Sequence, residues 1–237
     1  ILNNILNISA GYIEKYYDFI KKKKISKALT LFQVITPMKA GILGVDNLNI
    51  QLQKLFNHTK GKAFSSKVYE YKLTDKVIHI KNENMKAQTM SMYKSNSTEF
   101  MERRVYNGQL GLVIKLDFDE KKCVVLYPND DMVVFYDFDN IHHLLNLAYC
   151  LTIHKTQGKE YENALIPMSF SHYIMHNTKL LYTAITRAKS MCFIVGEEEA
   201  FKSACKKIEV TIRESVINDL LCNKDKKIET NSLSISV

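Results

Sequence analysis

The fold is constrained most by a change in the hydrophobic pattern near residue 75. Before residue 75 and after residue 145, bulky apolar runs alternate with stretches of helical spacing, which is typical of a parallel sheet covered by helices. Between these positions the runs are short and β-rich, and Asn, Asp, Gly and Pro divide them. The five runs are DKVIHIKN, LGLVIKLDF, KCVVLYP, MVVFYDF and IHHLLNL. They predict a small antiparallel β-barrel of about 70 residues inserted into an α/β domain.

We therefore expect residues 1–74 to form the first part of the α/β domain, residues 75–145 the inserted barrel, and residues 146–237 the remainder with a polar tail from Asn223. The predicted strands of the α/β domain are 31–36, 164–169 and 191–196, and the predicted helices are 12–29, 45–57, 180–189 and 197–207. Residues 85–104 lack a clear periodicity, so we expect a long loop or short helices there.

Composition narrows the class of protein without defining it. The 237 residues are 46% hydrophobic, which suits a globular protein. A net charge of +8 favours a polyanionic partner such as nucleic acid, although basic surfaces are also common in proteins that bind none. We find neither an apolar run of about 18 residues nor a secretory signal, so no membrane association is expected. The five cysteines form no CxxC pair and are expected to be reduced thiols of a cytoplasmic protein.

Residues 181–189, LYTAITRAK, place one arginine among small side chains. If the segment is helical, Leu181, Ile185 and Ala188 form an apolar stripe, and Thr183 and Arg187 share the other face. The planar, permanently charged guanidinium of Arg187 could then reach phosphate oxygens. On this segment alone, a surface arginine in an ordinary amphipathic helix is an equally good interpretation.

Residues 147–160, LAYCLTIHKTQGKE, begin as an apolar strand and change to polar residues before a glycine. Such a transition is typical of a loop or short helix that contacts a ligand. The residues that offer donors or acceptors are Thr152, His154, Lys155, Gln157 and Glu160. A lone histidine such as His154 is otherwise most often a surface or satisfied core residue.

Taken together, TIHKTQGKE and LYTAITRAK resemble motifs V and VI of superfamily 1 helicases, in the RecD-like branch of superfamily 1B. Residues 33–53, QVITPMKAGILGVDNLNIQLQ, resemble the motif IV region of the same family. The resemblance spans residues 33–207 and implies a second RecA-like domain, a parallel sheet flanked by helices, that carries an inserted Src-homology-3-like barrel. The expected β-rich insertion is itself a point of resemblance.

A phosphate-cradling GxxxxGK[ST] loop is missing from the sequence. The two Gly-Lys pairs, at residues 61–62 and 158–159, lack both the upstream glycine and the following hydroxyl residue. We therefore expect this chain to be the C-terminal half of a motor whose nucleotide-holding first RecA-like domain is not included. His172 and His176 have helical spacing, but without an HExxH motif or a cysteine pair they predict no metal site.

The family resemblance implies a role for each nucleotide-site residue. Arg187 matches the residue that stabilises charge on the γ phosphate from across the domain cleft, and is the catalytic candidate. Glu160 matches the position that contacts the nucleotide sugar. Lys39 matches a position near the phosphates and is the weaker match, while Gln157 and Gly158 complete the expected cofactor-binding group.

Thr152 and His154 match positions that contact the backbone of single-stranded DNA, and Lys155 is close enough to assist. The resemblance implies an ATP-dependent DNA helicase or translocase with 5′ to 3′ polarity, using ATP and Mg²⁺ held mainly by the N-terminal RecA-like domain. Expected partners are that domain, single-stranded DNA, duplex ends and, where the parent works in a nuclease complex, its subunits. The fragment alone is expected to be inactive. The alternative is a non-motor nucleic-acid-binding or regulatory module.

Overall fold

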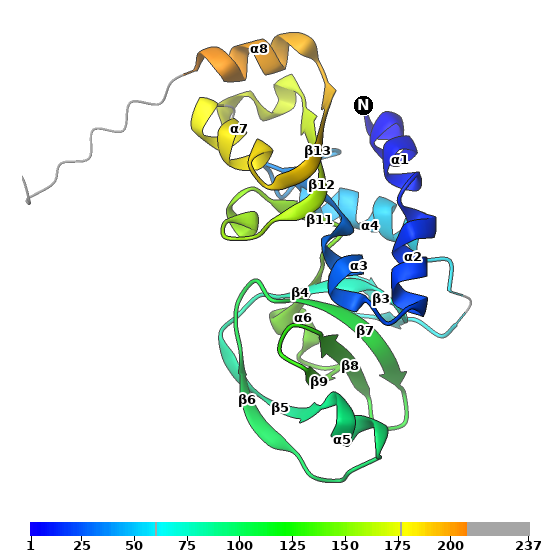
Figure 1. Ribbon diagram of the computed structural model, residues 1–237. Coiled ribbons are helices and arrows are strands. Elements are labelled where there is room, and N and C mark those ends of the chain that lie inside the picture. The colour runs from blue at the N-terminus through cyan, green and yellow to red at the C-terminus, as the bar shows by residue number, and fades with distance from the viewer. Residues whose placement is uncertain (60, 176, 208–237) are drawn as a thin grey trace, which may run out of the picture.

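The computed structural model describes residues 1–59, 61–175 and 177–207 (Figure 1). Its α/β part contains a four-stranded parallel sheet in the order β11-β1-β12-β13. The strands are β1 (Phe32–Thr36), β11 (Cys150–Thr152), β12 (Tyr161–Met168) and β13 (Ala188–Gly196). The three predicted strands of this part are confirmed, with β12 and β13 each beginning three residues earlier than expected.

Helices cover both faces of the parallel sheet. They are α1 (Leu2–Ala10), α2 (Ile13–Lys21), α3 (Ile25–Leu31), α4 (Val45–Phe56), α7 (Thr178–Ile185) and α8 (Glu198–Lys206). Neighbouring residues of a strand point to opposite faces, so Val34 packs in one cluster with Leu48 of α4. Ile35 packs in a second cluster with Leu181 of α7 and Ala204 of α8. Figure 1 accordingly shows α7 and α8 on one side of β12 and β13, and α1 and α4 on the other.

The predicted antiparallel insertion is present as a curled seven-stranded sheet in the order β10-β4-β7-β8-β9-β5-β6 (Figure 1). Its strands are β4 (Lys76–His79), β5 (Glu83–Thr89), β6 (Met101–Val105), β7 (Leu110–Asp117), β8 (Lys122–Tyr127), β9 (Met132–Asp137) and β10 (Leu145–Leu147). The short elements beside it are β2 (Phe64–Ser65), β3 (Glu70–Tyr71), α5 (Met90–Lys94) and α6 (Ile141–Leu144). The α/β class with an antiparallel insertion is thereby confirmed.

The expectation of a loop or short helices over 85–104 is largely wrong. Strands β5 and β6 pair with each other over this segment, and only α5 between them is helical. The strands escaped recognition because β6 lies at the end of the sheet, where Glu102, Arg103 and Arg104 are all exposed. A strand with polar residues on both faces has no apolar period, and charges of this kind are common on edge strands because they prevent further pairing.

The single helix expected over 12–29 is two helices, α2 and α3, separated by residues 22–24. Lys23 has a φ of 56°, in the left-handed region that ends a helix. The basic run of lysines therefore marks the turn between two helices, where four adjacent charges stay in solvent.

Two further expectations concern composition. Cys123, Cys150, Cys192 and Cys205 are free thiols in the structure, while Cys222 and the polar tail from Asn223 lie outside the described residues. Within residues 1–207, apart from the two undescribed positions, no helix is long and apolar enough to cross a membrane.

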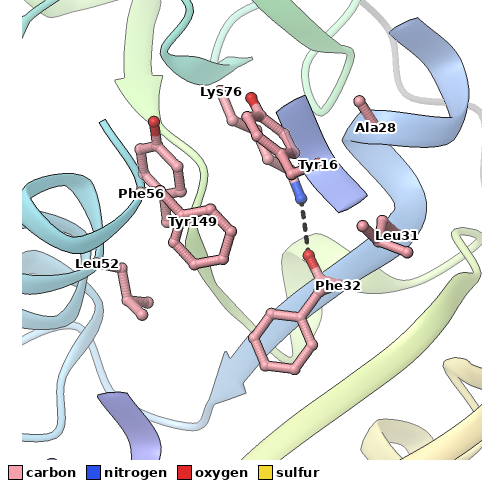
Figure 2. A pocket seen from close by; sticks show the side chains of 8 residues that line it. All are labelled: Tyr16, Ala28, Leu31, Phe32, Leu52, Phe56, Lys76 and Tyr149. Atoms are coloured by element: carbon pink, nitrogen blue, oxygen red, sulfur yellow. Dashed lines mark hydrogen bonds between the residues drawn. The ribbon is translucent and has the colours of Figure 1, made fainter. Parts of the chain in front are cut away.

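The two sheets are joined through a buried lysine at the start of β4. The side chain of Lys76 is only 2% exposed, and its Nζ donates to the carbonyl of Phe32 at 3.2 Å and to Gln33 Oε1 at 2.8 Å. This amine lies at a small cavity of about 10 Å³ that is otherwise mainly apolar. Figure 2 shows the side chains that line it, Tyr16 and Tyr149 among them, and the hydrogen bond from Lys76 to Phe32. Burial disfavours the charged form and lowers the pKa of Lys76 to about 7.

The preceding residue, Asp75, joins the insertion to α4. Its carboxylate accepts hydrogen bonds from Gln53 Nε2 at 2.6 Å, Asn57 Nδ2 at 2.7 Å and the Tyr149 hydroxyl at 2.9 Å. Burial raises the pKa of Asp75 to about 6, and these hydrogen bonds act in the opposite direction because they stabilise the carboxylate. Asp75 and Lys76 together fix where the insertion begins relative to the parallel sheet.

The lowered pKa of Lys76 makes stability depend on pH. Below about pH 7 the folded and unfolded chains both carry the proton, so the cost of burying the charge is fully present. As the pH rises toward 10.5, the folded protein has lost a proton that the unfolded chain keeps, so the free energy of unfolding increases.

Lys76→Met should remove this rise, measured as urea unfolding at several pH values across that window. Lys54→Met, which replaces an exposed lysine of α4, is the matched control and should keep it. An identical pH dependence in the wild-type and Lys76→Met proteins would contradict the prediction.

Candidate functional site

Arg187 does not lie on a helix, contrary to the expectation for residues 180–189. Helix α7 ends at Ile185, and β13 begins at Ala188. Pairing with the parallel sheet begins at this point: the backbone N–H of Tyr161 donates to the Arg187 carbonyl at 2.8 Å, and Ala188 pairs with Tyr161. Arg187 therefore occupies the turn that connects α7 to β13.

The guanidinium of Arg187 is half-buried and held by three hydrogen bonds. Its Nε donates to the Thr183 carbonyl at 3.0 Å, Nη1 to the Lys159 carbonyl at 3.1 Å, and Nη2 to Thr186 Oγ1 at 3.2 Å. A guanidinium has about five N–H donors, so two are left for a ligand. The side chain is oriented by its own turn and by the loop before β12, and it is not packed inside the sheet.

Arg187 lines a cavity of about 650 Å³ together with three other residues of the expected nucleotide group: Gln157, Gly158 and Glu160. The opposite wall comes from the insertion, through residues 107–110 and residues 129–130. Four residues from two separate sequence motifs thus meet at one hollow, and the hollow is shared with the inserted sheet.

The charges around this cavity are partly paired. Glu160 is exposed, and its Oε2 lies 2.9 Å from Lys189 Nζ. The hydrogen bond and the charge of Lys189, with a smaller contribution from Arg187, lower the pKa of Glu160, which is therefore a carboxylate at neutral pH. Three cations, Lys159, Arg187 and Lys189, face two carboxylates, Asp130 and Glu160, which leaves one net positive charge for an anion.

Gly158 has a φ of 74° in the turn that leads into β12, and a Cβ there would meet nothing within 4 Å. The glycine is needed for its backbone angle and not for space, because residues with a side chain rarely adopt the left-handed region. The turn directs Gln157 and Glu160, both exposed, toward the cavity.

The expected nucleic-acid residues follow the carboxyl ends of two strands, whereas Glu160 and Arg187 precede the amino ends of their strands. β1 ends at Thr36 and β11 ends at Thr152, and these two residues are paired. His154 and Lys155 follow in the short 3-10 helix His154–Thr156, with His154 exposed and Lys155 half-buried. Glu160, by contrast, directly precedes the amino end of β12.

Lys39 belongs spatially with this second group. It is exposed in the turn after β1, and it is not among the residues that line the Arg187 cavity. Burial, followed by the charge of Lys39, lowers the pKa of Lys155, so the two lysines act on the same region. Lys39, Thr152, His154 and Lys155 thus gather where two parallel strands end, a common place for ligands in α/β sheets.

Sequence reasoning missed Lys159 and Lys189 as members of the Arg187 cavity. Lys189 is the last residue of LYTAITRAK, so its nearness to Arg187 was visible, but its pairing with Glu160 was not. Lys159 directly precedes Glu160, and nothing in the motif shows that the insertion would pack against it. Both contacts depend on which strands are neighbours in the folded protein, so neither can be predicted from the local sequence.

The structure describes one of the two histidines with helical spacing, for which the sequence predicts no metal site. His172 is buried in the 3-10 helix Phe170–Met175, while His176 lies outside the described residues. Among the residues that the structure describes, no three His, Cys, Asp or Glu side chains are grouped so that they could hold a metal ion.

Comparison with known proteins identifies the family. The UvrD-like helicase C-terminal domain matches residues 147–195, the stretch that holds both site motifs. The chain is similar to the ATP-dependent RecD2 DNA helicase of Deinococcus radiodurans, with 31% identity over 172 residues, covering 73% of this chain and 21% of the relative. It is also similar to the RecBCD enzyme subunit RecD of Buchnera aphidicola, with 21% identity, covering 85% of this chain and 31% of the relative.

Among solved structures, the Pif1 helicase from Candida albicans aligns over 93% of this chain and 58% of its own, with 15% identity and a TM-score of 0.45. The chain spans less than a third of the length of either of these curated relatives. The family match covers the strands β11, β12 and most of β13, and the RecD2 similarity extends over most of the chain. The chain belongs to the RecD-like helicases and carries a UvrD-like helicase C-terminal domain.

Proposed function

We propose that this chain is the C-terminal motor half of an ATP-dependent 5′ to 3′ DNA helicase or translocase, and that Arg187 is its arginine finger. The observation that carries the proposal is the shared cavity of Arg187 and Glu160, in which two guanidinium N–H donors remain unused. The direction of movement comes from the family resemblance alone.

In this proposal ATP lies between this domain and the N-terminal RecA-like domain. The free N–H groups of Arg187 stabilise the charge that develops on the γ phosphate, a contribution worth about 10³ to 10⁵ in rate in related systems. The three hydrogen bonds that hold Arg187 keep its guanidinium oriented before ATP arrives, so little reorganisation is needed at the moment of reaction.

Glu160 accepts hydrogen bonds from the ribose hydroxyls in this proposal. Its lowered pKa keeps it a carboxylate, which has only acceptors and suits hydroxyl donors. Gln157 and Gly158, which line the same cavity, complete the contact with the nucleotide. The cavity offers cations and amides but no cluster of carboxylates, so its donor set fits phosphate, and we assign the Mg²⁺ ligands to the N-terminal domain.

The second group holds single-stranded DNA in this proposal. The Thr152 hydroxyl, the exposed imidazole of His154 and the ammonium group of Lys155 can each donate to a phosphate oxygen without reading the base. We place Lys39 with them, because it lies near Lys155 and away from the Arg187 cavity. Two neighbouring lysines would also make the binding sensitive to salt.

Only eight residues, 153–160, separate the last residue of β11 from the first residue of β12. They connect the proposed DNA group to the proposed nucleotide group. Closure of the two motor domains on ATP would therefore move both groups together, and shift this half along the strand. Single-stranded DNA, duplex ends, the N-terminal motor domain and nuclease-complex subunits are the partners that this proposal includes.

Arg187→Ala in the full-length protein should lower the kcat of DNA-stimulated ATP hydrolysis by about 10³, because it removes the charge that stabilises the γ phosphate in the transition state. Binding of single-stranded DNA, measured by fluorescence anisotropy, should be nearly unchanged because Arg187 lies in the other group. Arg103→Ala, on the exposed edge strand β6, is the control for loss of a positive charge. Normal turnover in Arg187→Ala would overturn the assigned role.

His154→Ala should instead weaken binding of single-stranded DNA by about ten-fold, the loss expected for one hydrogen bond to a phosphate. ATP hydrolysis at saturating DNA should stay close to that of the wild type. His143→Ala removes an exposed histidine of α6 and serves as the control. An unchanged DNA affinity in His154→Ala would show that the carboxyl edge of the parallel sheet is not the DNA site.

The 237-residue chain alone should hydrolyse no ATP above background, because its sequence contains no GxxxxGK[ST] loop to hold the phosphates. The measurement is phosphate release with and without single-stranded DNA. Clear turnover would contradict the division of the site between two domains. A full-length protein that lacked such a loop would favour the alternative, a non-motor nucleic-acid-binding module.

A further inference from the structure

The Arg187 cavity has one wall made by the insertion, and the contact there is close. The turn at residues 107–108 joins β6 to β7 and faces the side chain of Lys159. A Cβ placed on Gly108 would lie 2.9 Å from Lys159 Nζ and 3.7 Å from its Cε. The end of the Lys159 side chain therefore lies close to Gly108, and a residue with a Cβ at this position would have to displace it.

This turn is firmly attached to the inserted sheet. The Gly108 N–H donates to the His79 carbonyl at 2.7 Å, and the Asn107 N–H donates to Asn82 Oδ1 at 2.7 Å. The N–H of Tyr106 donates to Gln109 Oε1 at 2.6 Å, which closes the turn. Gly108 has a φ of 95°, so the turn also depends on glycine for its backbone angle. The surface that meets Lys159 moves only if the insertion moves.

Lys159 in turn takes part in three hydrogen bonds, two within its own loop of residues 153–160 and one with Arg187. Its Nζ donates to the Lys155 carbonyl at 2.7 Å, and its N–H donates to the Thr156 carbonyl at 3.0 Å. Its own carbonyl accepts from Arg187 Nη1 at 3.1 Å. One residue thus contacts the insertion with its side chain and orients the guanidinium with its backbone.

We infer that the insertion is a positioning element for Arg187: its turn at Asn107 and Gly108 holds Lys159, and the carbonyl of Lys159 holds the guanidinium. Lys159 and Gly108 also line the cavity, but in this inference both act through Arg187, because the Lys159 carbonyl accepts from its guanidinium. The inference rests on the proposed role of Arg187 in ATP hydrolysis. It gives the insertion a part in the hydrolytic step, so that a ligand or partner which shifts the insertion would also shift the arginine.

A simple packing contact would predict a different outcome from a positioning contact. If Lys159 only fills space, its replacement lowers stability and leaves the rate per folded molecule unchanged. If it positions Arg187, its replacement lowers kcat while ATP binding is retained, because a misplaced group costs transition-state stabilisation more than ground-state binding.

The test uses the full-length protein and Lys159→Met, which keeps the length of the side chain and removes the ammonium group. We expect kcat for ATP hydrolysis to fall about ten-fold, with the KM for ATP and the affinity for single-stranded DNA within about two-fold of wild type. Lys115→Met, which removes an exposed lysine of the same insertion, should leave kcat unchanged.

Gly108→Ala provides an independent second variant, acting from the other side of the contact, and should lower kcat in the same direction. Its backbone strain needs its own control, since alanine is disfavoured at this φ. Gly41 has a φ of 94° and open space around it, so the loss of Tm in Gly41→Ala measures the cost of the angle alone. A larger loss of Tm in Gly108→Ala than in Gly41→Ala would measure the additional cost of displacing the Lys159 side chain.

The decisive comparison combines Lys159→Met with Arg187→Ala. If Lys159 acts through Arg187, the double variant should turn over no more slowly than Arg187→Ala alone, because the group being positioned is already missing. A further loss of kcat in the double variant would overturn the inference.

Failure of the inference and failure of the proposed function are distinguishable. Normal turnover in Arg187→Ala would reject the arginine finger itself. Slow turnover in Arg187→Ala, combined with wild-type kcat in both Lys159→Met and Gly108→Ala, would reject the positioning role and leave the finger in place.

Discussion

The hydrogen bond from the backbone N–H of Tyr161 to the carbonyl of Arg187, at 2.8 Å, joins the two segments that carry the proposed nucleotide residues. It is the first link of the parallel pairing between β12 and β13, and it forms where α7 has just ended. The buried strand β12 must pair its backbone groups, and it does so with the residues that follow α7. This pairing places the Arg187 turn beside the loop that carries Glu160. The shared cavity follows from this pairing.

The position of the insertion depends on a different kind of interaction. Asp75 and Lys76 are adjacent, buried and oppositely charged, yet each is satisfied by neutral partners and not by the other. Such groups are costly to bury, and removing their partners would be costlier still, which favours one arrangement of the two sheets over others. Strand β4 begins at Lys76 and ends at His79, whose carbonyl accepts a hydrogen bond from the Gly108 N–H. The position of Gly108 beside Lys159 therefore depends on the buried residues at the start of the same strand.

The parallel sheet divides the proposed functions between its edges. The residues proposed to hold DNA follow the carboxyl ends of β1 and β11, and those proposed to hold the nucleotide precede the amino ends of β12 and β13. The loop of residues 153–160 connects the two edges, and the Nζ of Lys159 donates back to the Lys155 carbonyl within it. In the proposed motor, this short, internally hydrogen-bonded loop is the connection through which a displacement of the nucleotide group would reach the DNA group.

Local pattern was sufficient to predict the buried strands β1 and β12, the helix α4 and the class of the insertion, because runs and periods of apolar residues report on which faces are buried. It also predicted the strand β13 but not its exposure, since only Val195 of that strand is buried. It was also sufficient to select the two polar segments that hold Arg187 and Glu160. It failed for β6, whose exposed edge has no apolar period, and for Arg187, whose turn is formed by pairing with a distant strand. Only long-range packing decided that Lys39 lies apart from Arg187 and that Gly108 lies close to Lys159. The residues of each pair are far apart in the chain, so no local sequence pattern could show how they are arranged.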